Sequence, residues 1–202
     1  MKKFLLLASA LCFAAASASA FEFNPYISAK AKYSLARHEL KVTGTFQDKA
    51  KLKDEIFGGS LAVGNIYNVM NGDFRIELEY TKNADAKKHQ AKAKTQAALF
   101  NVYYDLNLNT SVPVKPYVGA GLGWGQTKVS GNGQSIKDDT VAVQIGCGIN
   151  YYINQNFVVD LGYRYINYGD FDKEYRIPGL LYEKYEYKPF AHEFLLGLRY
   201  EF

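Results

Sequence analysis

The residues best suited to chemistry are charged side chains that recur at every second position inside apolar segments. Within residues 73–81, Arg75, Glu77 and Glu79 alternate with apolar and aromatic residues. A period of two places alternate side chains on opposite faces of a β-strand. The charged residues predicted to share the face opposite the apolar rows are Lys30, Lys32, Arg75, Glu77, Glu79, Asp105, Asp160, Arg164, Glu193, Arg199 and Glu201.

This mixture of acids and bases predicts ion pairing in a confined interior. An uncompensated buried charge costs several kcal/mol, so the five cations and six anions are expected to form a network across the lumen of a closed sheet. Arg75 and Arg199 are the expected hubs, because one guanidinium can bridge two carboxylates. Asp160 is a candidate partner of Arg199, since their strands are expected to be neighbours.

The sequence gives little support for a metal, cofactor or nucleotide site. Cys147 and the scattered His38, His89 and His192 do not form a metal-ligand cluster. The glycines of 116–125 recur at every second residue, with no Lys-Ser/Thr pair and no helical pattern after them. We interpret them as the inner face of a narrow barrel, where bulky side chains from other strands need room, and we expect no cofactor.

The N-terminal residues predict export. Lys2 and Lys3 precede an apolar run at 4–16, and Ala-Ser-Ala at 18–20 is a typical cleavage site, so residues 1–20 are predicted to be a signal peptide. The chain has 24 Lys and Arg against 20 Asp and Glu, and removing Lys2 and Lys3 leaves 22 against 20. That balance gives no argument for a nucleic-acid partner. Cys147 would then be the only cysteine, so no intrachain disulfide is expected.

Eight predicted strands position these charged residues. Alternation predicts strands at 23–35, 57–67, 73–81, 95–106, 116–125, 140–151, 157–167 and 191–202. Long polar connections at 37–55, 82–94, 128–139 and 168–189 alternate with short ones, of which Asn71-Gly72 is a strong hairpin signal. The prediction is an all-β, eight-stranded antiparallel up-and-down transmembrane β-barrel over residues 21–202, with both termini in the periplasm.

Alternation alone does not decide whether lipid covers the apolar face. A soluble lipocalin-like barrel would show the same period of two, with its apolar face turned inward. The signal peptide, the aromatic Phe202 at the end of the apolar row and the lack of a disulfide favour the membrane. Tyrosines near strand ends are then expected to form aromatic girdles at the two membrane interfaces. The residues assigned to these girdles are Tyr26, Tyr67, Tyr80, Tyr151 and Tyr200.

The segments YVGAGLGWG (117–125), VDLGYRYINYGD (159–170) and EFLLGLRYEF (193–202) resemble the OmpA-like and opacity-family outer-membrane barrels. The resemblance covers essentially the whole exported chain and implies a Gram-negative outer-membrane location among lipid and lipopolysaccharide. It implies insertion by the barrel-assembly machinery, with Tyr200 and Phe202 as the insertion signal. It also implies surface loops that bind host or matrix ligands. No periplasmic peptidoglycan-binding domain of the OmpA kind is expected.

Three functions remain open at this point. The first is a non-enzymatic surface barrel, structural or adhesive, with a lysine-rich second connection as a candidate contact for acidic ligands: Lys82, Lys87, Lys88, Lys92 and Lys94. The second is a small porin or hydrophobic-compound channel, although eight strands leave little interior space. The third is a lipid A-modifying barrel enzyme. The resembling deacylases carry a His and a Ser where this chain has Tyr-Ile-Asn-Tyr at 165–168, so no catalytic residues are assigned.

Overall fold

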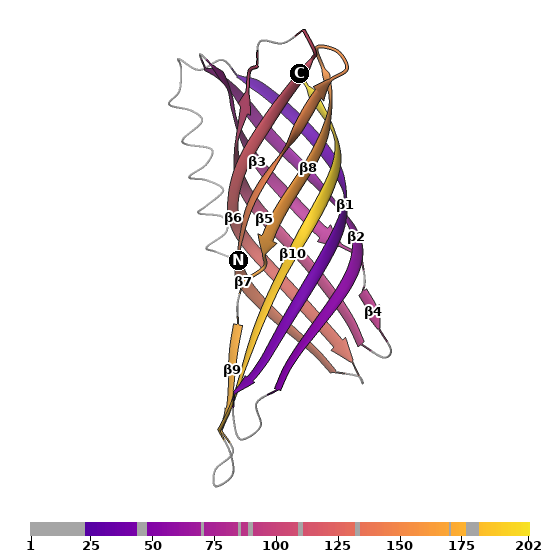
Figure 1. The fold of residues 1–202 in the computed structure, drawn as a ribbon, viewed down its shortest axis with the longest axis vertical. Helices are drawn as coiled ribbons and strands as arrows, with labels where there is room; N and C mark the ends of the chain where they lie inside the picture. Colours follow the sequence, from indigo (N-terminus) through magenta and orange to yellow (C-terminus); the bar gives the residue numbers. More distant parts are fainter. Residues whose placement is uncertain are drawn as a thin grey trace.

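The computed structural model describes residues 23–43, 48–69, 71–84, 86–88, 91–108, 111–131, 134–169, 171–176 and 182–202 (Figure 1). The predicted signal peptide at 1–20 lies outside these residues. The strands are β1 (Asn24–Thr43), β2 (Asp48–Val69), β3 (Gly72–Asn83), β4 (Ala86–Lys88), β5 (Ala91–Leu106), β6 (Val114–Gly131), β7 (Gln134–Tyr152), β8 (Phe157–Asn167), β9 (Phe171–Arg176) and β10 (Tyr182–Glu201).

Eight of these strands form a closed antiparallel barrel, which confirms the predicted fold. The order runs β1-β2-β3-β5-β6-β7-β8-β10, and β10 pairs with β1 to close the ring. The short strands β4 and β9 pair with β5 and β10. Closure pairs the backbone groups of the first and last strands, so the barrel has no free edge. None of the described segments is a helix of sufficient length and apolarity to cross a bilayer.

The two ends of the barrel differ. Short links join β2 to β3, β5 to β6 and β7 to β8 at one end, called the turn end, where the Phe202 N–H also donates to the Pro25 carbonyl oxygen at 3.1 Å. The opposite end, called the loop end, carries β4 and β9 and the projecting parts of β1, β2 and β10 (Figure 1).

The strands extend further toward the loop end than alternation predicts. β1 stays paired with β2 as far as Val42 opposite Asp48, and with β10 as far as Thr43 opposite Lys184. The predicted connections at 37–55, 82–94, 128–139 and 168–189 are therefore too long. In β1 the phase that carries apolar wall residues up to Leu35 continues with Arg37, Glu39 and Lys41, so the apolar row stops although backbone pairing continues.

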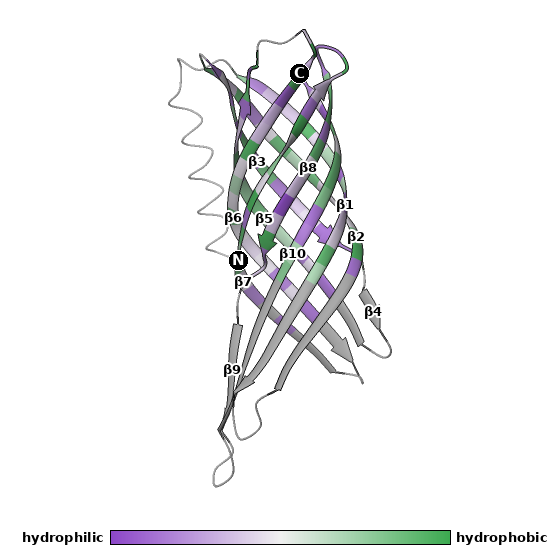
Figure 2. Ribbon diagram, in the orientation of Figure 1, coloured by the Kyte–Doolittle hydropathy of each residue, from purple (hydrophilic) through white to green (hydrophobic). Residues whose placement is uncertain are grey.

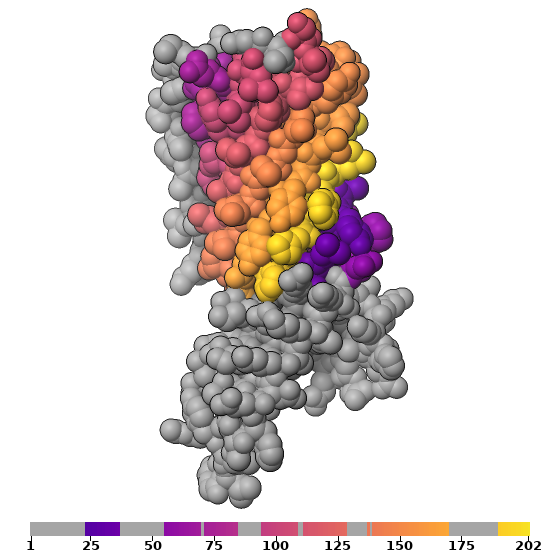
Figure 3. All heavy atoms as spheres, in the orientation of Figure 1, coloured from indigo at the N-terminus to yellow at the C-terminus, as the bar shows by residue number. Residues whose placement is uncertain are grey.

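The outer wall is apolar and the interior is polar. Leu61, Ile145 and Leu196 are 67, 65 and 56% exposed, whereas Arg75 and Glu77 are each 1% exposed. Hydropathy alternates along the strands in Figure 2, and Figure 3 shows a continuous outer surface over β7, β8 and β10. A soluble barrel would bury its apolar rows and expose its charges, so this polarity favours lipid around the wall and excludes the lipocalin-like alternative.

Glycines on the inner face make room for aromatic rings, as the sequence predicts. A Cβ atom added at Gly148 of β7 would lie 2.5 Å from Oη of Tyr117 on β6. A Cβ atom added at Gly119 would overlap the ring of Tyr103 on β5. Any larger residue at these two positions would have to displace a lumen tyrosine, and at Gly148 it would also press on the backbone carbonyl oxygen of Leu161 on β8.

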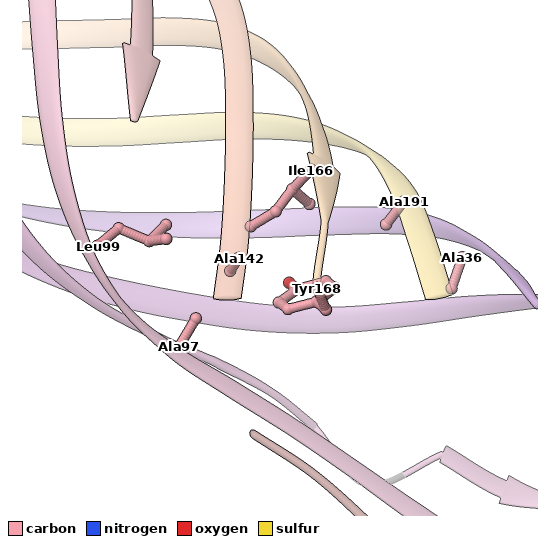
Figure 4. Close-up of a cluster of buried hydrophobic side chains, with 7 residues drawn as sticks. All are labelled: Ala36, Ala97, Leu99, Ala142, Ile166, Tyr168 and Ala191. Atoms are coloured by element: carbon pink, nitrogen blue, oxygen red, sulfur yellow. The ribbon is translucent and has the colours of Figure 1, made fainter. Parts of the chain in front are cut away.

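Toward the loop end, the interior becomes apolar. A cluster of small and aliphatic side chains with one tyrosine lies inside the ring of strands (Figure 4). Ala97, Ala142 and Ile166 are fully buried there. The whole cluster is Ala36, Ala97, Leu99, Ala142, Ile166, Tyr168 and Ala191. Along their strands, Ala36, Ile166 and Ala191 lie two residues from Ser34, Arg164 and Glu193 toward the loop end, so the cluster adjoins the charged part of the lumen on that side.

Candidate functional site

The structure places the predicted charged residues in the lumen. Ten are buried: Lys30, Lys32, Arg75, Glu77, Glu79, Asp105, Asp160, Arg164, Glu193 and Arg199. Glu201 is half-buried at the turn end. Five of the eight barrel strands contribute to this group, namely β1, β3, β5, β8 and β10, because alternation along each strand turns every second side chain inward.

Arg164 on β8 is the hub of the network. Its Nε lies 2.6 Å from Glu193 Oε2, and its Nη1 lies 2.8 Å from Glu79 Oε1 on β3. Glu193 also pairs with Lys32 at 3.2 Å and accepts a hydrogen bond from Ser34 Oγ at 2.7 Å. The predicted hubs, Arg75 and Arg199, do not hold this bridging position. Strand parity, that is, whether a residue falls on the odd or even positions of its strand, predicts which face a side chain takes. It does not predict how far along the barrel axis, at which level, each charge lies.

A second group surrounds Glu77 near the middle of the lumen. Lys30 Nζ lies 2.9 Å from Glu77 Oε1 and 3.8 Å from Glu79 Oε2, so it links this group to the Arg164 hub. Tyr26 Oη donates to Glu77 Oε2 at 3.0 Å. Tyr103 Oη donates to Glu77 Oε1 at 3.4 Å. The carboxylates of Glu77 and Glu79, at neighbouring levels of the barrel, thus share Lys30.

A third group lies near the turn end. Arg75 binds Asp105 through two hydrogen bonds, of 2.6 Å from Nε and 3.0 Å from Nη2. Arg199 pairs with Glu201 at 2.9 Å. The predicted pair of Arg199 with Asp160 is wrong. Register places Asp160 opposite Gly197 and Val158 opposite Arg199, and Asp160 accepts a hydrogen bond from Tyr117 Oη at 2.7 Å.

Four tyrosines hydrogen-bond to carboxylates of the lumen network, and the sequence argument missed this role. Tyr26 is 1% exposed and lies inside the barrel, so its assignment to an aromatic girdle is wrong. The Arg75 guanidinium makes cation–π contacts with Tyr103 and Tyr117, with its Cζ at 4.6 and 5.1 Å from the two ring centroids. Tyr168, predicted to lie in a connection, donates to Glu193 at 2.9 Å. Strand parity was the available signal for Tyr26, Tyr103 and Tyr117, which share the inward phase of the charged residues.

The lumen geometry favours obstruction over catalysis. The buried acids are held by arginine, lysine, tyrosine or amide donors, and the apolar cluster adjoins them on the loop side. An eight-stranded barrel is wide enough only for its own side chains or for one small ligand, and here large charged and aromatic side chains occupy the interior. What this arrangement does chemically is to neutralise charge and fill the interior.

The predicted surface residues lie at both ends of the wall. Tyr200 packs edge-on between Phe157 and Phe202 at the turn end, at centroid distances of 5.1 and 5.0 Å. Their role as an insertion signal remains a prediction. Lys82 and Lys94 are exposed toward the loop end.

For the other three predicted loop lysines, the structure describes the backbone only. Lys87 of β4 is paired with Lys92 of β5, and Lys88 is paired with Ala91. The side chains of Lys87, Lys88 and Lys92 lie outside the described part of the structure. Their binding role remains a prediction.

The family comparison covers nearly the whole chain. The model of the "Outer membrane protein beta-barrel domain" family matches residues 4–202. The outer membrane protein PagN of Salmonella typhimurium is 29% identical, over 93% of each chain.

Solved structures share the fold at lower identity. Neisserial surface protein A (NspA) superimposes with a TM-score of 0.62 at 21% identity, over 88% of this chain and 97% of that one. The attachment invasion locus protein Ail of Yersinia pestis, in complex with the heparin analogue sucrose octasulfate, gives a TM-score of 0.52 at 19% identity. That match covers 90% of this chain and 99% of Ail.

Proposed function

Because the chain belongs to the outer membrane protein β-barrel domain family, we propose that it is a non-enzymatic, non-conducting barrel that binds acidic ligands on its loop side. The Gram-negative outer membrane is its location, and the loop end faces outward. The turn end, with both termini, faces the periplasm. Residues 1–20 are removed on export, and mass spectrometry of the mature protein tests that cleavage.

The paired strand extensions at the loop end carry this proposal. β1 continues for eight residues from Leu35 to Thr43, paired with β2 as far as Val42 and with β10 as far as Thr43. That length corresponds to about 26 Å of strand, or about 20 Å along the barrel axis at a tilt of about 40°. The barrel therefore presents an ordered backbone platform beyond the apolar wall. A filled lumen leaves this platform and its connections as the accessible binding surface.

The chemistry of the candidate ligand follows from the lysines at this end. Lys87 and Lys92 are directly paired across β4 and β5, so two like charges start from neighbouring backbone positions. Like charges in such a position repel each other, and a polyanion relieves the repulsion. Ail was crystallised with a heparin analogue, which makes a sulfated glycan the first probe for this chain.

The test compares wild-type protein in lipid nanodiscs with a variant carrying Lys87→Gln, Lys88→Gln and Lys92→Gln. Binding to immobilised heparin should weaken in the Gln variant and persist in the matched Arg variant, which keeps the charge. The difference should shrink as salt rises, because exposed charges are screened over about 8 Å at physiological ionic strength. Equal, salt-independent binding by all three proteins would refute the loop-side site.

A further inference from the structure

The sheet divides beyond the closed part of the barrel. β2 pairs with β3 only as far as Gly58, opposite Asn83, and the next bond across this boundary runs from the Ala84 N–H to the Phe57 carbonyl oxygen at 2.7 Å. Nearer the loop end, β2 pairs with β1 alone among the strands that the structure describes, while β4 pairs with β5. Residues 48–56, which we call the β2 edge, therefore have a described partner strand on one side only, over about 30 Å. The β2 edge projects beyond the barrel together with β1, β9 and β10 (Figure 1).

The backbone phase of the β2 edge follows from the hydrogen bond at Phe57. In an antiparallel ladder, alternate residues turn both their N–H and their C=O groups toward the same neighbouring strand. The Phe57 carbonyl group faces β3, so the odd-numbered residues of the β2 edge turn their N–H and C=O groups away from β1. These residues are Lys49, Lys51, Lys53 and Glu55. The β2 edge thus offers an added strand a regular row of backbone donors and acceptors.

The sequence of the β2 edge alternates with a polarity opposite to that of the wall below it. Residues 49–53 read Lys-Ala-Lys-Leu-Lys. The three lysines continue the outward phase of Leu61, an exposed apolar residue of the wall. Ala50 and Leu52 continue the phase of Ile56, which packs against the apolar cluster of the interior. A strand added here would therefore need acidic residues on its outer face and apolar residues on its inner face.

The β1 side of the ladder leaves the positive charge of the β2 edge largely uncompensated. Register places Lys49 opposite Lys41. It places Lys53 opposite Arg37, and only the middle lysine lies opposite an acid, Glu39. Like charges directly opposite each other on adjacent strands destabilise a sheet, and opposite charges stabilise it. Acidic residues on the far side of β2 would relieve this repulsion.

We propose that the β2 edge binds an extended segment of another protein in which acidic and apolar residues alternate. The segment adds as an antiparallel strand, and its backbone bonds to the odd-numbered residues of the β2 edge. Three acidic residues at every second position take the places opposite Lys49, Lys51 and Lys53, and the apolar residues between them continue the phase of Ala50 and Leu52. Strand pairing distinguishes this partner from the glycan proposed for β4 and β5, which is attracted by charge alone.

The probe is a fluorescent, end-blocked peptide with the sequence Glu-Val-Glu-Ile-Glu between glycines, and its binding to wild-type protein in lipid nanodiscs is measured by anisotropy. A shuffled peptide, Glu-Glu-Glu-Val-Ile, keeps the composition and charge and loses the alternation. N-methylation of the three glutamates removes the N–H groups that bond to the β2 edge, whereas N-methylation of the valine and isoleucine leaves them in place. The shuffled and glutamate-methylated peptides should bind roughly tenfold more weakly or worse, since each loses backbone hydrogen bonds.

Proline in the β2 edge tests the same contact from the protein side. Lys51→Pro removes an N–H that faces away from β1, so the ladder with β1 keeps its bonds, and edge strands tolerate proline at such a position. Lys51→Gln is the matched control, because it loses the same charge and keeps the N–H. Lys51→Pro should bind the alternating peptide roughly tenfold more weakly than Lys51→Gln. Heat-modifiable mobility on a gel shows that each variant is folded.

Equal binding of the alternating and shuffled peptides, or of the two methylated peptides, would overturn the strand-pairing site. Equal affinity of Lys51→Pro and Lys51→Gln for the alternating peptide would do the same. Should Lys51→Pro fail to fold, the methylated peptides on wild-type protein decide the question.

The variant carrying Lys87→Gln, Lys88→Gln and Lys92→Gln should bind the alternating peptide as wild type does. Loss of peptide binding in that variant would assign the peptide to β4 and β5 and would overturn the β2 edge as its site. Failure of the same variant to lose heparin binding would count only against the loop-side glycan site, so the two proposals can fail separately.

Discussion

Replacing Arg164 by Met should destabilise the barrel by about 3 kcal/mol. Loss of the guanidinium removes the ion pairs with Glu193 at 2.6 Å and Glu79 at 2.8 Å. Removing one partner of a buried ion pair costs about 3–5 kcal/mol, since the other charge stays buried. The lower value applies because each carboxylate keeps a second cation. Glu193 retains Lys32 at 3.2 Å and Glu79 retains Lys30 at 3.8 Å.

Urea unfolding of the protein in lipid vesicles, followed by Trp124 fluorescence, measures this free energy. Arg164→Lys should fall between wild type and Arg164→Met, because an ammonium group cannot bridge two carboxylates in the same fixed geometry. A double-mutant cycle with Glu79→Gln should give a coupling of about 1–3 kcal/mol. The exposed Lys82→Gln is the control and should stay within about 0.5 kcal/mol of wild type. An Arg164→Met protein as stable as this control would refute the hub assignment.

Further predictions concern the wall and the packing. Ile145→Arg on the apolar wall should cost about 2–4 kcal/mol in vesicles, whereas Ile153→Arg at the turn end should cost at most about 1 kcal/mol; equal costs would contradict the assigned membrane depth. Gly148→Ala should cost about 1–3 kcal/mol, because the added Cβ atom clashes with Tyr117 and with the Leu161 carbonyl oxygen. Cys147→Ala, on the exposed outer face, should stay within about 1 kcal/mol, and equal costs in the same unfolding assay would disprove this.

Strand parity alone predicted much of this molecule. It placed Arg75, Glu77 and Glu79 on one face of a single strand, and in the structure these three side chains are buried in the lumen. The same parity carried information on Tyr26, but the preference of tyrosine for membrane interfaces led to the wrong side of the wall. Period-two alternation is therefore a stronger guide than residue type when the two disagree.

The identity of the ion-pair partners could not be predicted in the same way. Partnership depends on the stagger between strands, which sets the level of each side chain along the axis, and alternation contains no information on stagger. Arg164 reaches Glu79 although β8 and β3 are not neighbours in the sheet. The extension of β1 to Thr43 was missed for a different reason, because the phase that is apolar up to Leu35 continues with Arg37, Glu39 and Lys41, so the apolar row ends before the strand does.

The conductance of purified wild-type protein in a planar lipid bilayer tests the filled lumen most directly. The ion pairs centred on Arg164, with the apolar cluster beyond them, predict no steady current above the bare membrane at moderate voltage. Brief, irregular openings caused by local rearrangement are compatible with this expectation. A large, steady and ohmic conductance from the folded wild-type barrel would contradict it, and would make the lumen, rather than the outer surface, the functional part of the molecule.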